Sequence, residues 1–400
     1  MQEHARTATD SRPPRAAAFP DTAVSLLRES LRGQLLTPGD DGYEEARSVY
    51  NAMIQRHPAA IARVADVADV ITCVNTARDG NLTLAVRGGG HNAAGLGIVD
   101  AGHVVDLGNL TGLRVDAQAR TVRVEAGCLW GDVDHATHPF GLAVPCGFIA
   151  STGVAGLTLG GGSGYLTRSC GLTIDNLLAA DVVLADGSYV TASADEHPDL
   201  FWALRGGGGN FGIVTSFLFR AHPVKNVIGG PTMWALDKAE DALRGFQDLI
   251  ESAPEELGGF FAFTAVPPVP PFPEELHGRT VAAVVWCHNG SQETFDDIVG
   301  PLVAPDATAY RHRDAMWSQV IVGVDPDPAN AGKLRDWAVT YHDALHPHST
   351  GAAYVNFMMD EGQDRIEATY GDNYDRLRQI KRRYDPDNLF HVNQNIPPAG

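Results

Sequence analysis

Basic residues are scarce in this sequence. Its 400 residues include 30 lysines and arginines against 49 aspartates and glutamates, which gives a formal net charge of −19. A nucleic-acid partner requires a basic surface for its phosphates, and an anionic membrane surface attracts the same positive charge. The composition therefore argues against nucleic acid and an anionic membrane surface as partners.

Long apolar runs and metal-binding cysteine motifs are also missing. No stretch approaches the roughly 18 consecutive apolar residues of a membrane-spanning helix, and the first 20 residues lack the apolar segment of a secretory signal. The five cysteines, at positions 73, 128, 146, 170 and 287, are widely spaced and include no Cys-x-x-Cys pair. We therefore expect a cytoplasmic protein without a disulfide framework or a metal site.

Glycine, in contrast, is abundant and clustered. Residues 87–91 read Arg-Gly-Gly-Gly-His, residues 159–165 read Leu-Gly-Gly-Gly-Ser-Gly-Tyr, and residues 205–212 read Arg-Gly-Gly-Gly-Gly-Asn-Phe-Gly. Because glycine lacks a Cβ atom and tolerates positive φ, such runs let backbone N–H groups approach a bulky anionic ligand. Three clusters imply one long ligand that is held from several sides, and a dinucleotide fits best.

None of the clusters has the form of a nicotinamide-binding or triphosphate-binding loop. A Rossmann fingerprint is Gly-x-Gly-x-x-Gly between the first strand and its helix, with an acidic residue about 20 positions later. No cluster follows that order, and the chain contains no Gly-x-x-x-x-Gly-Lys-Ser/Thr string. A nicotinamide-dependent reductase is therefore a disfavoured alternative.

Helical and strand-like patterns alternate along the chain and predict an α+β protein. The patterns predict helices over 21–31, 67–78, 130–138, 197–204, 239–252 and 370–383, strands over 61–64, 84–86, 104–107, 112–116, 121–125, 213–219 and 280–286, and a hairpin over 182–191.

Several strings extend the pattern of the glycine clusters. They are residues 87–92, 153–157 leading into 160–162, 171–176, 181–187, 199–206, 210–215, 384–390 and 393–396. In this order they resemble the berberine-bridge-enzyme-like FAD-linked oxidases, whose flavin domain is shared with vanillyl-alcohol oxidase, and among these the bacterial 6-hydroxy-D-nicotine-oxidase-like members. The resemblance covers about residues 43–222 and 350–396.

The resemblance implies how the chain is divided. A tail and helix over 1–42 precede a two-subdomain FAD-binding domain over 43–222. An antiparallel-sheet substrate domain follows over 223–365, and residues 366–400 return to the FAD domain. Between residues 298–302 and 303–310 the family pattern jumps by several dozen residues, so we expect a shortened substrate domain.

In such enzymes the histidine behind the first glycine run is bonded to the 8α carbon of the flavin, so the resemblance implies covalent FAD at His91. A neutral imidazole nitrogen is a suitable nucleophile for that bond; a histidine that is only hydrogen-bonded within a turn is the alternative. Some relatives have a second bond, from a cysteine eleven residues before the Gly-Gly-Gly run. That position is Ile149 here, and Cys146 lies three residues too early. We therefore predict attachment at a single point.

The resemblance also implies which residues surround FAD. We expect the first glycine run at the pyrophosphate, the second against the ribityl chain or ring, the third at the adenine, and two asparagines near the ring. The predicted set is Arg87, Gly88, Gly89, Gly90, His91, Asn92, Gly153, Val154, Gly156, Leu157, Gly160, Gly161, Gly162, Asn210, Gly212, Ile213, Val214, Asn393 and Asn395. For members other than the glycines, a purely structural role is an equal alternative.

Hydride transfer to a flavin requires a base when a proton must also leave. Many relatives have this base as the tyrosine of an Asn-Tyr pair, but the matching residues here are Asn356 and Phe357. Tyr354 lies two residues before Asn356, so on a strand both would share one face. A second family tyrosine is replaced by Ser163, with Tyr165 two positions on. Tyr165, Tyr354 and Asn356 are therefore the catalytic candidates, and packing is the alternative role of both tyrosines.

The resulting hypothesis is an FAD-dependent oxidoreductase that oxidises a small organic molecule at a C–O or C–N bond. Molecular oxygen is the expected acceptor, with release of hydrogen peroxide. Two alternatives stay open: a dehydrogenase with another acceptor, and a flavin-binding protein impaired by its shortened substrate domain. A homo-oligomer is compatible with the sequence.

Overall fold

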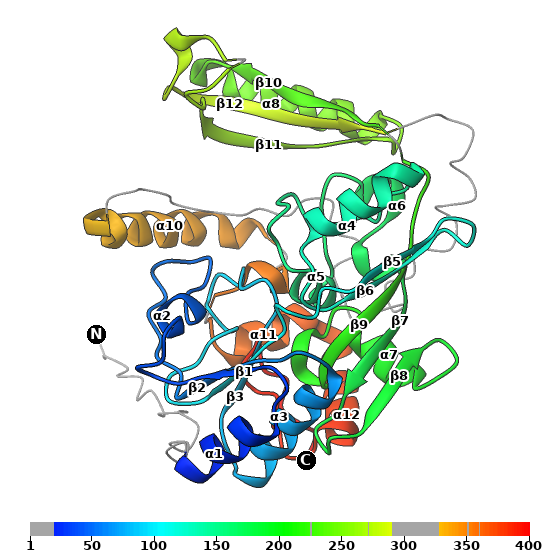
Figure 1. Ribbon diagram of the computed structural model, residues 1–400. Coiled ribbons are helices and arrows are strands. Elements are labelled where there is room, and N and C mark those ends of the chain that lie inside the picture. The colour runs from blue at the N-terminus through cyan, green and yellow to red at the C-terminus, as the bar shows by residue number, and fades with distance from the viewer. Residues whose placement is uncertain (1–19, 225, 271, 290–327, 350–351, 360) are drawn as a thin grey trace.

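The structure of the chain is a computed structural model that describes residues 20–224, 226–270, 272–289, 328–349, 352–359 and 361–400. It combines three sheets with helices, and the predicted α+β class is confirmed (Figure 1). The N-terminal residues 1–19 and the jump in the family pattern near 298–310 lie outside the described residues.

A four-stranded sheet holds the first glycine loop. Its order is β1 (Gln34–Leu36), β2 (Ala60–Arg63), β4 (His103–Asp106), β3 (Leu84–Arg87), with β2, β4 and β3 parallel and β1 antiparallel. The parallel strands are short, apolar and largely buried, as is typical of strands covered on both faces. Helix α3 (Val67–Asp79) joins β2 to β3 and buries Val70 and Val74 in the core. Because β3 ends at Arg87, the glycine run begins at the carboxyl edge of the parallel strands.

A five-stranded antiparallel sheet leads out of the third glycine loop. Its order is β5 (Leu113–Asp116), β6 (Thr121–Glu125), β9 (Ile213–Arg220), β7 (Leu177–Val183), β8 (Tyr189–Ser193). The predicted hairpin turns at Gly187, which has a φ of 82°. Phe217 and Phe219 of β9 are fully buried and pack near Trp130, the first residue of α4 (Trp130–Thr137). This apolar interior fixes the strand that follows the loop.

A separate three-stranded antiparallel sheet lies at one end of the molecule, beyond α4, α5 and α6 (Figure 1). Its order is β10 (Ile228–Trp234), β12 (Thr280–His288), β11 (Leu257–Ala265). Helix α8 (Ala239–Ser252) covers one face, where Phe246 and Ile250 pack against Val284. The sheet therefore has its own small apolar core.

The C-terminal part of the chain forms two helices, one of which contacts the third glycine loop. The single helix predicted over 370–383 is wrong at its start, because α11 (Gln363–Tyr370) ends before Gly371, whose φ of 47° breaks the helix, and α12 (Tyr374–Tyr384) begins three residues later. Lys381 of α12 is fully buried, 2.5 Å from the Asp385 carboxylate. Its ammonium group also donates to the carbonyls of Asn210, at 2.7 Å, and Phe390, at 3.0 Å. Helix α12 thus ties the third glycine loop to the C-terminal segment.

The other helices are α1 (Asp21–Ser30), α2 (Tyr43–Ala46), α5 (Val154–Leu159), α6 (Thr167–Cys170), α7 (Pro198–Leu204) and α10 (Ala331–Leu345). All five cysteines are free thiols; Cys146 is half-buried and the others are buried. Within the described ranges, no helix is long and apolar enough to cross a membrane. In the same part of the chain, no group of three or more His, Cys, Asp or Glu side chains could hold a metal ion.

Candidate cofactor and active site

A cavity of about 390 Å³ lies where the three glycine loops meet the C-terminal segment. Its wall includes seventeen of the predicted residues: Arg87, Gly88, Gly89, Gly90, His91, Asn92, Gly153, Gly156, Leu157, Gly160, Asn210, Gly212, Ile213, Val214, Tyr354, Asn356 and Asn393. Five predicted residues do not line it: Val154, Gly161, Gly162, Asn395 and Tyr165. The fold therefore brings segments from four distant parts of the sequence to one cavity.

Arg87 anchors the first glycine loop. Its buried guanidinium forms a 2.6 Å ion pair with Asp106 on the neighbouring strand β4. It also donates to the backbone carbonyls of Ala46 and Ser48. Because this charge is neutralised within the protein, Arg87 holds the position of the loop that leads to His91.

The glycines of the loops are of two kinds. A Cβ atom on Gly89 would lie 2.4 Å from the backbone nitrogen of Gly153, so the first and second loops touch backbone to backbone. A Cβ atom on Gly156 would meet nothing within 4 Å, although Gly156 lines the cavity. The contact between Gly89 and Gly153 brings two walls of the cavity together, whereas Gly156 leaves open space within the cavity.

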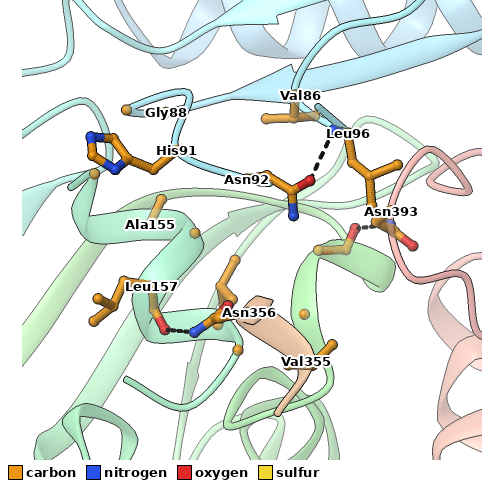
Figure 2. A pocket seen from close by; sticks show the side chains of 18 of the residues that line it. Val86, Gly88, His91, Asn92, Leu96, Ala155, Leu157, Val355, Asn356 and Asn393 are labelled. Atoms are coloured by element: carbon orange, nitrogen blue, oxygen red, sulfur yellow. Dashed lines mark hydrogen bonds between the residues drawn. The ribbon is translucent and has the colours of Figure 1, made fainter. Parts of the chain in front are cut away.

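His91 lies at the edge of the cavity near Gly88 and Ala155, across the view from Asn393 (Figure 2). Its Nε2 atom is 3.1 Å from the hydroxyl oxygen of Ser151. The Tyr50 ring stacks on the imidazole, with 4.1 Å between ring centroids and 19° between planes. Burial lowers the pKa of His91, and a hydrogen bond to the Ser151 backbone partly offsets that effect. The imidazole is therefore neutral near pH 7, as a nucleophilic nitrogen must be.

Tyr354 and Asn356 form a hydrogen-bonded pair on the cavity wall. The Tyr354 hydroxyl oxygen accepts from the Gly162 backbone N–H, at 2.7 Å, and from the Asn356 amide, at 2.8 Å. The same amide donates to the Leu157 carbonyl at 3.0 Å (Figure 2). The strand considered for this segment is wrong, since residues 355–357 form a 3-10 turn. The turn nevertheless brings the two side chains together, and a Cβ atom on Gly160 would overlap Asn356, so the bare glycine makes room for it.

Tyr165 lies in an aromatic cluster beside the three-stranded sheet. Its ring meets Phe148 edge to face, with centroids 4.9 Å apart, and Phe148 meets Phe260 of β11 at 5.2 Å. Burial raises the pKa of the Tyr165 hydroxyl. Nearby, Arg168 of α6 donates to the Leu257 carbonyl at 2.6 Å. The cluster and this hydrogen bond join the second glycine loop and helix α6 to the three-stranded sheet.

The C-terminal wall contains two buried polar atoms without a partner among the described residues. Asn393 donates to the carbonyls of Gly209 and Phe390, both at 3.1 Å, but its Oδ1 atom accepts no hydrogen bond. The hydroxyl of Tyr370 is likewise unpaired, and burial raises its pKa, which keeps it protonated. Both residues line the cavity. Buried polar atoms normally have partners, so a polar ligand is expected to supply them here.

Sequence reasoning missed Ser151, Tyr50, Tyr370 and Gln394. The first two reach His91 from other parts of the chain, and Gln394 donates to the carbonyls of Met358 and Met359. Asn210, predicted at the cofactor, uses both ends of its amide inside the protein, on Gly207 and Ile396. No local pattern separates these roles, because each depends on contacts between distant segments.

Comparisons with known proteins match both parts of this site. The sequence profile of the family described as FAD binding domain matches residues 58–193, and that of the family described as Berberine and berberine like matches residues 353–397. The chain belongs to the berberine-bridge-enzyme-like FAD-linked oxidoreductases. The two matched ranges contain the first and second glycine loops and the C-terminal wall of the cavity.

Individual relatives span nearly the whole oxidoreductase. It is 29% identical to the FAD-linked oxidoreductase YgaK of Bacillus subtilis strain 168 over 451 aligned positions, which cover 93% of this chain and 98% of the relative. It is 28% identical to the (R)-6-hydroxynicotine oxidase of Paenarthrobacter nicotinovorans over 452 positions, with coverage of 93% and 98%. Both alignments have more positions than this chain has residues, so the chain lacks segments that these relatives carry. The solved structure of Physcomitrella patens BBE-like 1 shares the fold, with a TM-score of 0.81 at 23% identity over 94% of this chain and 99% of that one.

The residues of the cavity fit FAD. The open space at Gly156 leaves room for a bulky group, and the bare backbone of Gly88–Gly90 can approach a pyrophosphate. The unpaired side-chain oxygen Oδ1 of Asn393 offers a hydrogen-bond acceptor to a heterocycle, and the unpaired hydroxyl of Tyr370 offers a donor. The family assignment and these features agree on the cofactor.

Proposed function

We propose that this FAD-linked oxidoreductase oxidises a small organic molecule at a C–O or C–N bond, holds FAD covalently through His91, and uses dioxygen as the final electron acceptor with release of hydrogen peroxide. The observation that carries the proposal is the Tyr354–Asn356 pair, which lines the same cavity as His91 and the glycine loops. When bound, FAD supplies the two-electron acceptor for a hydride from the substrate.

Tyr354 is the proposed base of this reaction. Hydrogen bonds donated to its oxygen by Gly162 and Asn356 hold the hydroxyl group in a fixed position on the cavity wall, as a general base requires. Tyr165 is the weaker candidate, since its ring packs against Phe148 and it does not line the cavity. The base thus comes from a tyrosine three residues before Phe357, which occupies the usual family position.

Residues 43–222 and 366–400 form the proposed FAD module, and residues 223–365 the proposed substrate module. A dehydrogenase with another acceptor is the second candidate function, because the exposed Phe148, Ile149 and Phe357 line the cavity and a physiological acceptor can approach there as well as dioxygen. A flavin-binding protein without turnover is the third candidate function. It is supported by the absence from this chain of segments that its relatives carry.

One experiment separates these functions. Yellow protein is mixed anaerobically with a panel of aromatic and aliphatic alcohols and amines and with oligosaccharides, and flavin absorbance is followed before and after admission of air. An oxidase bleaches with a substrate, regains its colour in air and produces hydrogen peroxide. Flavin that is bleached by a substrate but does not regain its colour in air identifies a dehydrogenase. If no compound of the panel bleaches the flavin but dithionite does, the result supports the flavin-binding protein without turnover.

Substituting Tyr354 tests the proposed base. We expect Tyr354→Phe to slow flavin reduction by a substrate about 100-fold, the lower range for loss of a general base, with FAD content unchanged. Tyr165→Phe is the comparison. If Tyr165→Phe slows reduction and Tyr354→Phe does not, the assignment of the base is reversed.

A further inference from the structure

One face of the three-stranded sheet meets the wall of the cavity. The other face packs against α8, since Phe261 and Trp286 belong to the apolar core around Phe246. Side chains alternate between the two faces of a strand, and residues paired directly across an antiparallel sheet share one face. Phe260 of β11 therefore projects away from α8, and its ring contacts that of Phe148 on the cavity wall, with 5.2 Å between centroids.

This second face is apolar. By the pairing of the strands it comprises Gly229, Pro231 and Met233 of β10, Gly258, Phe260, Ala262 and Thr264 of β11, and Val281, Ala283, Val285 and Cys287 of β12. Within these three described strands, no position of the face is charged, and the one hydroxyl, that of Thr264, donates to the Ala265 carbonyl at 3.3 Å. Phe260, Ala262 and Val285 are only half-buried. The face thus offers apolar contact area to a ligand and no strong hydrogen bond.

The cavity wall continues the apolar surface of the sheet. Phe148, Ile149 and Phe357 line the cavity, yet 39%, 52% and 45% of their surfaces are exposed. Phe357 also meets the ring of Tyr354 edge to face, with 4.9 Å between centroids. Large apolar side chains that are gathered and exposed at one place mark a surface for a ligand or a partner. Because these three line a cavity, we expect a ligand.

Leu157 connects Phe148 to the hydroxyl of Tyr354. A Cβ atom on Gly147, the neighbour of Phe148, would lie 2.5 Å from one methyl carbon of Leu157, and a Cβ atom on Gly162 would lie 2.7 Å from the other. Gly162 is also the residue whose backbone N–H reaches the Tyr354 hydroxyl. The same leucine side chain therefore borders the apolar wall and the proposed base.

The part of the cavity wall that the structure describes has no unpaired charge. Arg87 is its only side chain with a permanent charge, and Asp106 neutralises it at 2.6 Å. The imidazole of His91 is neutral near pH 7, because burial lowers its pKa. The amide N–H groups of Asn356 and Gln394 already donate to backbone carbonyls. An ionised group would therefore lose its hydration in this cavity without gaining a counter-charge.

We propose that the substrate is an uncharged molecule with an aromatic or alicyclic body, which packs against Phe148, Ile149 and Phe357 and directs its hydroxyl or amino group toward Tyr354. The inference deepens the proposed function and rests on it, because it places the substrate beside the proposed base. An amine binds as its free base. Oligosaccharides, which need many hydrogen-bonding partners, and molecules that carry a carboxylate or an ammonium group are rejected.

Binding to the oxidised, FAD-loaded, full-length protein tests this inference without turnover. Aniline, 4-ethylaniline and 4-propylaniline, which are uncharged at pH 7, are titrated, and calorimetry and the change in flavin absorbance give the dissociation constants. We expect 4-propylaniline to bind about fourfold more tightly than 4-ethylaniline, the factor for one buried methylene group. Replacing its terminal methyl group by a carboxylate, in 3-(4-aminophenyl)propionate, or by an ammonium group, in 2-(4-aminophenyl)ethylamine, is expected to weaken binding about 100-fold or more. Cellobiose is expected not to bind.

Variants of one phenylalanine locate the apolar wall. We expect Phe148→Ala to bind 4-propylaniline about tenfold more weakly than wild type, because much of the apolar contact is lost, and Phe148→Leu to stay within about threefold. Phe140→Ala is the control, since Phe140 is also an exposed phenylalanine, at 54%, but does not line the cavity. Its affinity is expected to equal that of wild type.

The outcomes separate this inference from the proposed function. Equal affinities along the aniline series, no binding by any of the three anilines, or tighter binding of cellobiose or of either charged analogue overturns the inference. Unchanged affinity in Phe148→Ala overturns it as well. If the anilines bind as expected but no alcohol or amine bleaches the flavin, the oxidation in the proposed function fails, and the class of ligand that the cavity accepts is still as inferred.

Discussion

Neighbouring glycines in these loops serve different physical purposes. Gly89 and Gly153 are bare because two backbones touch at that point, and any Cβ atom would force the loops apart. A Cβ atom on Gly156 would meet no protein atom within 4 Å, so packing within the protein does not require glycine there. The fold therefore requires glycine at positions 89 and 153, whereas we expect the ligand to require it at position 156.

Alanine substitutions separate the two purposes. Gly89→Ala is expected to lower the free energy of unfolding by about 3 kcal/mol, as overpacking does. Gly156 lies within α5, where alanine is favoured over glycine by about 0.5–1 kcal/mol, so Gly156→Ala is expected to be at least as stable as wild type yet to hold less FAD. Denaturant unfolding and flavin content measure the two effects. Full flavin content in Gly156→Ala would show that the cofactor does not lie against this residue.

At the residue scale, the sequence predicts those features of the site that depend on residues adjacent in the chain. Glycine runs, and the histidine behind one of them, are local signals, and their convergence on one cavity was predictable. Ser151 and Tyr50 were not, since an exposed serine and a loop tyrosine have no distinctive pattern and meet His91 only through the tertiary fold. The Tyr354–Asn356 pair was predicted from spacing, although a 3-10 turn and not a strand brings it about.

Among the secondary-structure elements, strands with apolar runs were predicted and those with unusual composition were not. Strand β12 is a continuous apolar run, which the sequence shows clearly. Strand β10 contains Gly229, Gly230 and Pro231, residues that weaken strand propensity, and it is tolerated because it lies at the edge of its sheet. Pairing with β12 supplies the stability that local propensity does not.

Helix α12 depends on a buried ion pair. We expect Asp385→Asn to lower the free energy of unfolding by about 3 kcal/mol, because it leaves the fully buried Lys381 ammonium without a counter-charge. FAD content should fall as well, since Lys381 also holds the carbonyls of Asn210 and Phe390.

The control for this variant has the same helical spacing at the surface. Glu240 and Arg244 of α8 form an exposed i,i+4 pair, and Glu240→Gln is expected to cost about 0.5 kcal/mol or less. Equal losses in the two variants would mean that burial does not decide the strength of the Lys381 pair.

For the molecule as a whole, two buried histidines contribute to the response to acid. Burial lowers the pKa of His103 and of His222 from 6.5 to about 4. An unfolded chain binds these protons near pH 6.5, whereas the folded chain does not, so stability is fully present above pH 6.5 and is lost as the pH falls toward 4. Each unit of pKa difference corresponds to about 1.4 kcal/mol.

Denaturant unfolding at pH values between 7 and 4 measures this loss. His222→Gln is expected to flatten the dependence of unfolding free energy on pH by up to one proton, because glutamine does not titrate. If the variant and wild-type profiles run parallel over this range, His222 does not contribute to acid unfolding.

The five free thiols of this chain bear on the hydrogen peroxide release proposed for it. Oxidation of cysteine to sulfenic acid proceeds through the thiolate. Desolvation raises the pKa of every one of these thiols, that of Cys128 to about 11, so almost none is ionised in neutral solution. The peroxide proposed as product would therefore meet the cysteine sulfur of this enzyme in its protonated form, which peroxide attacks slowest.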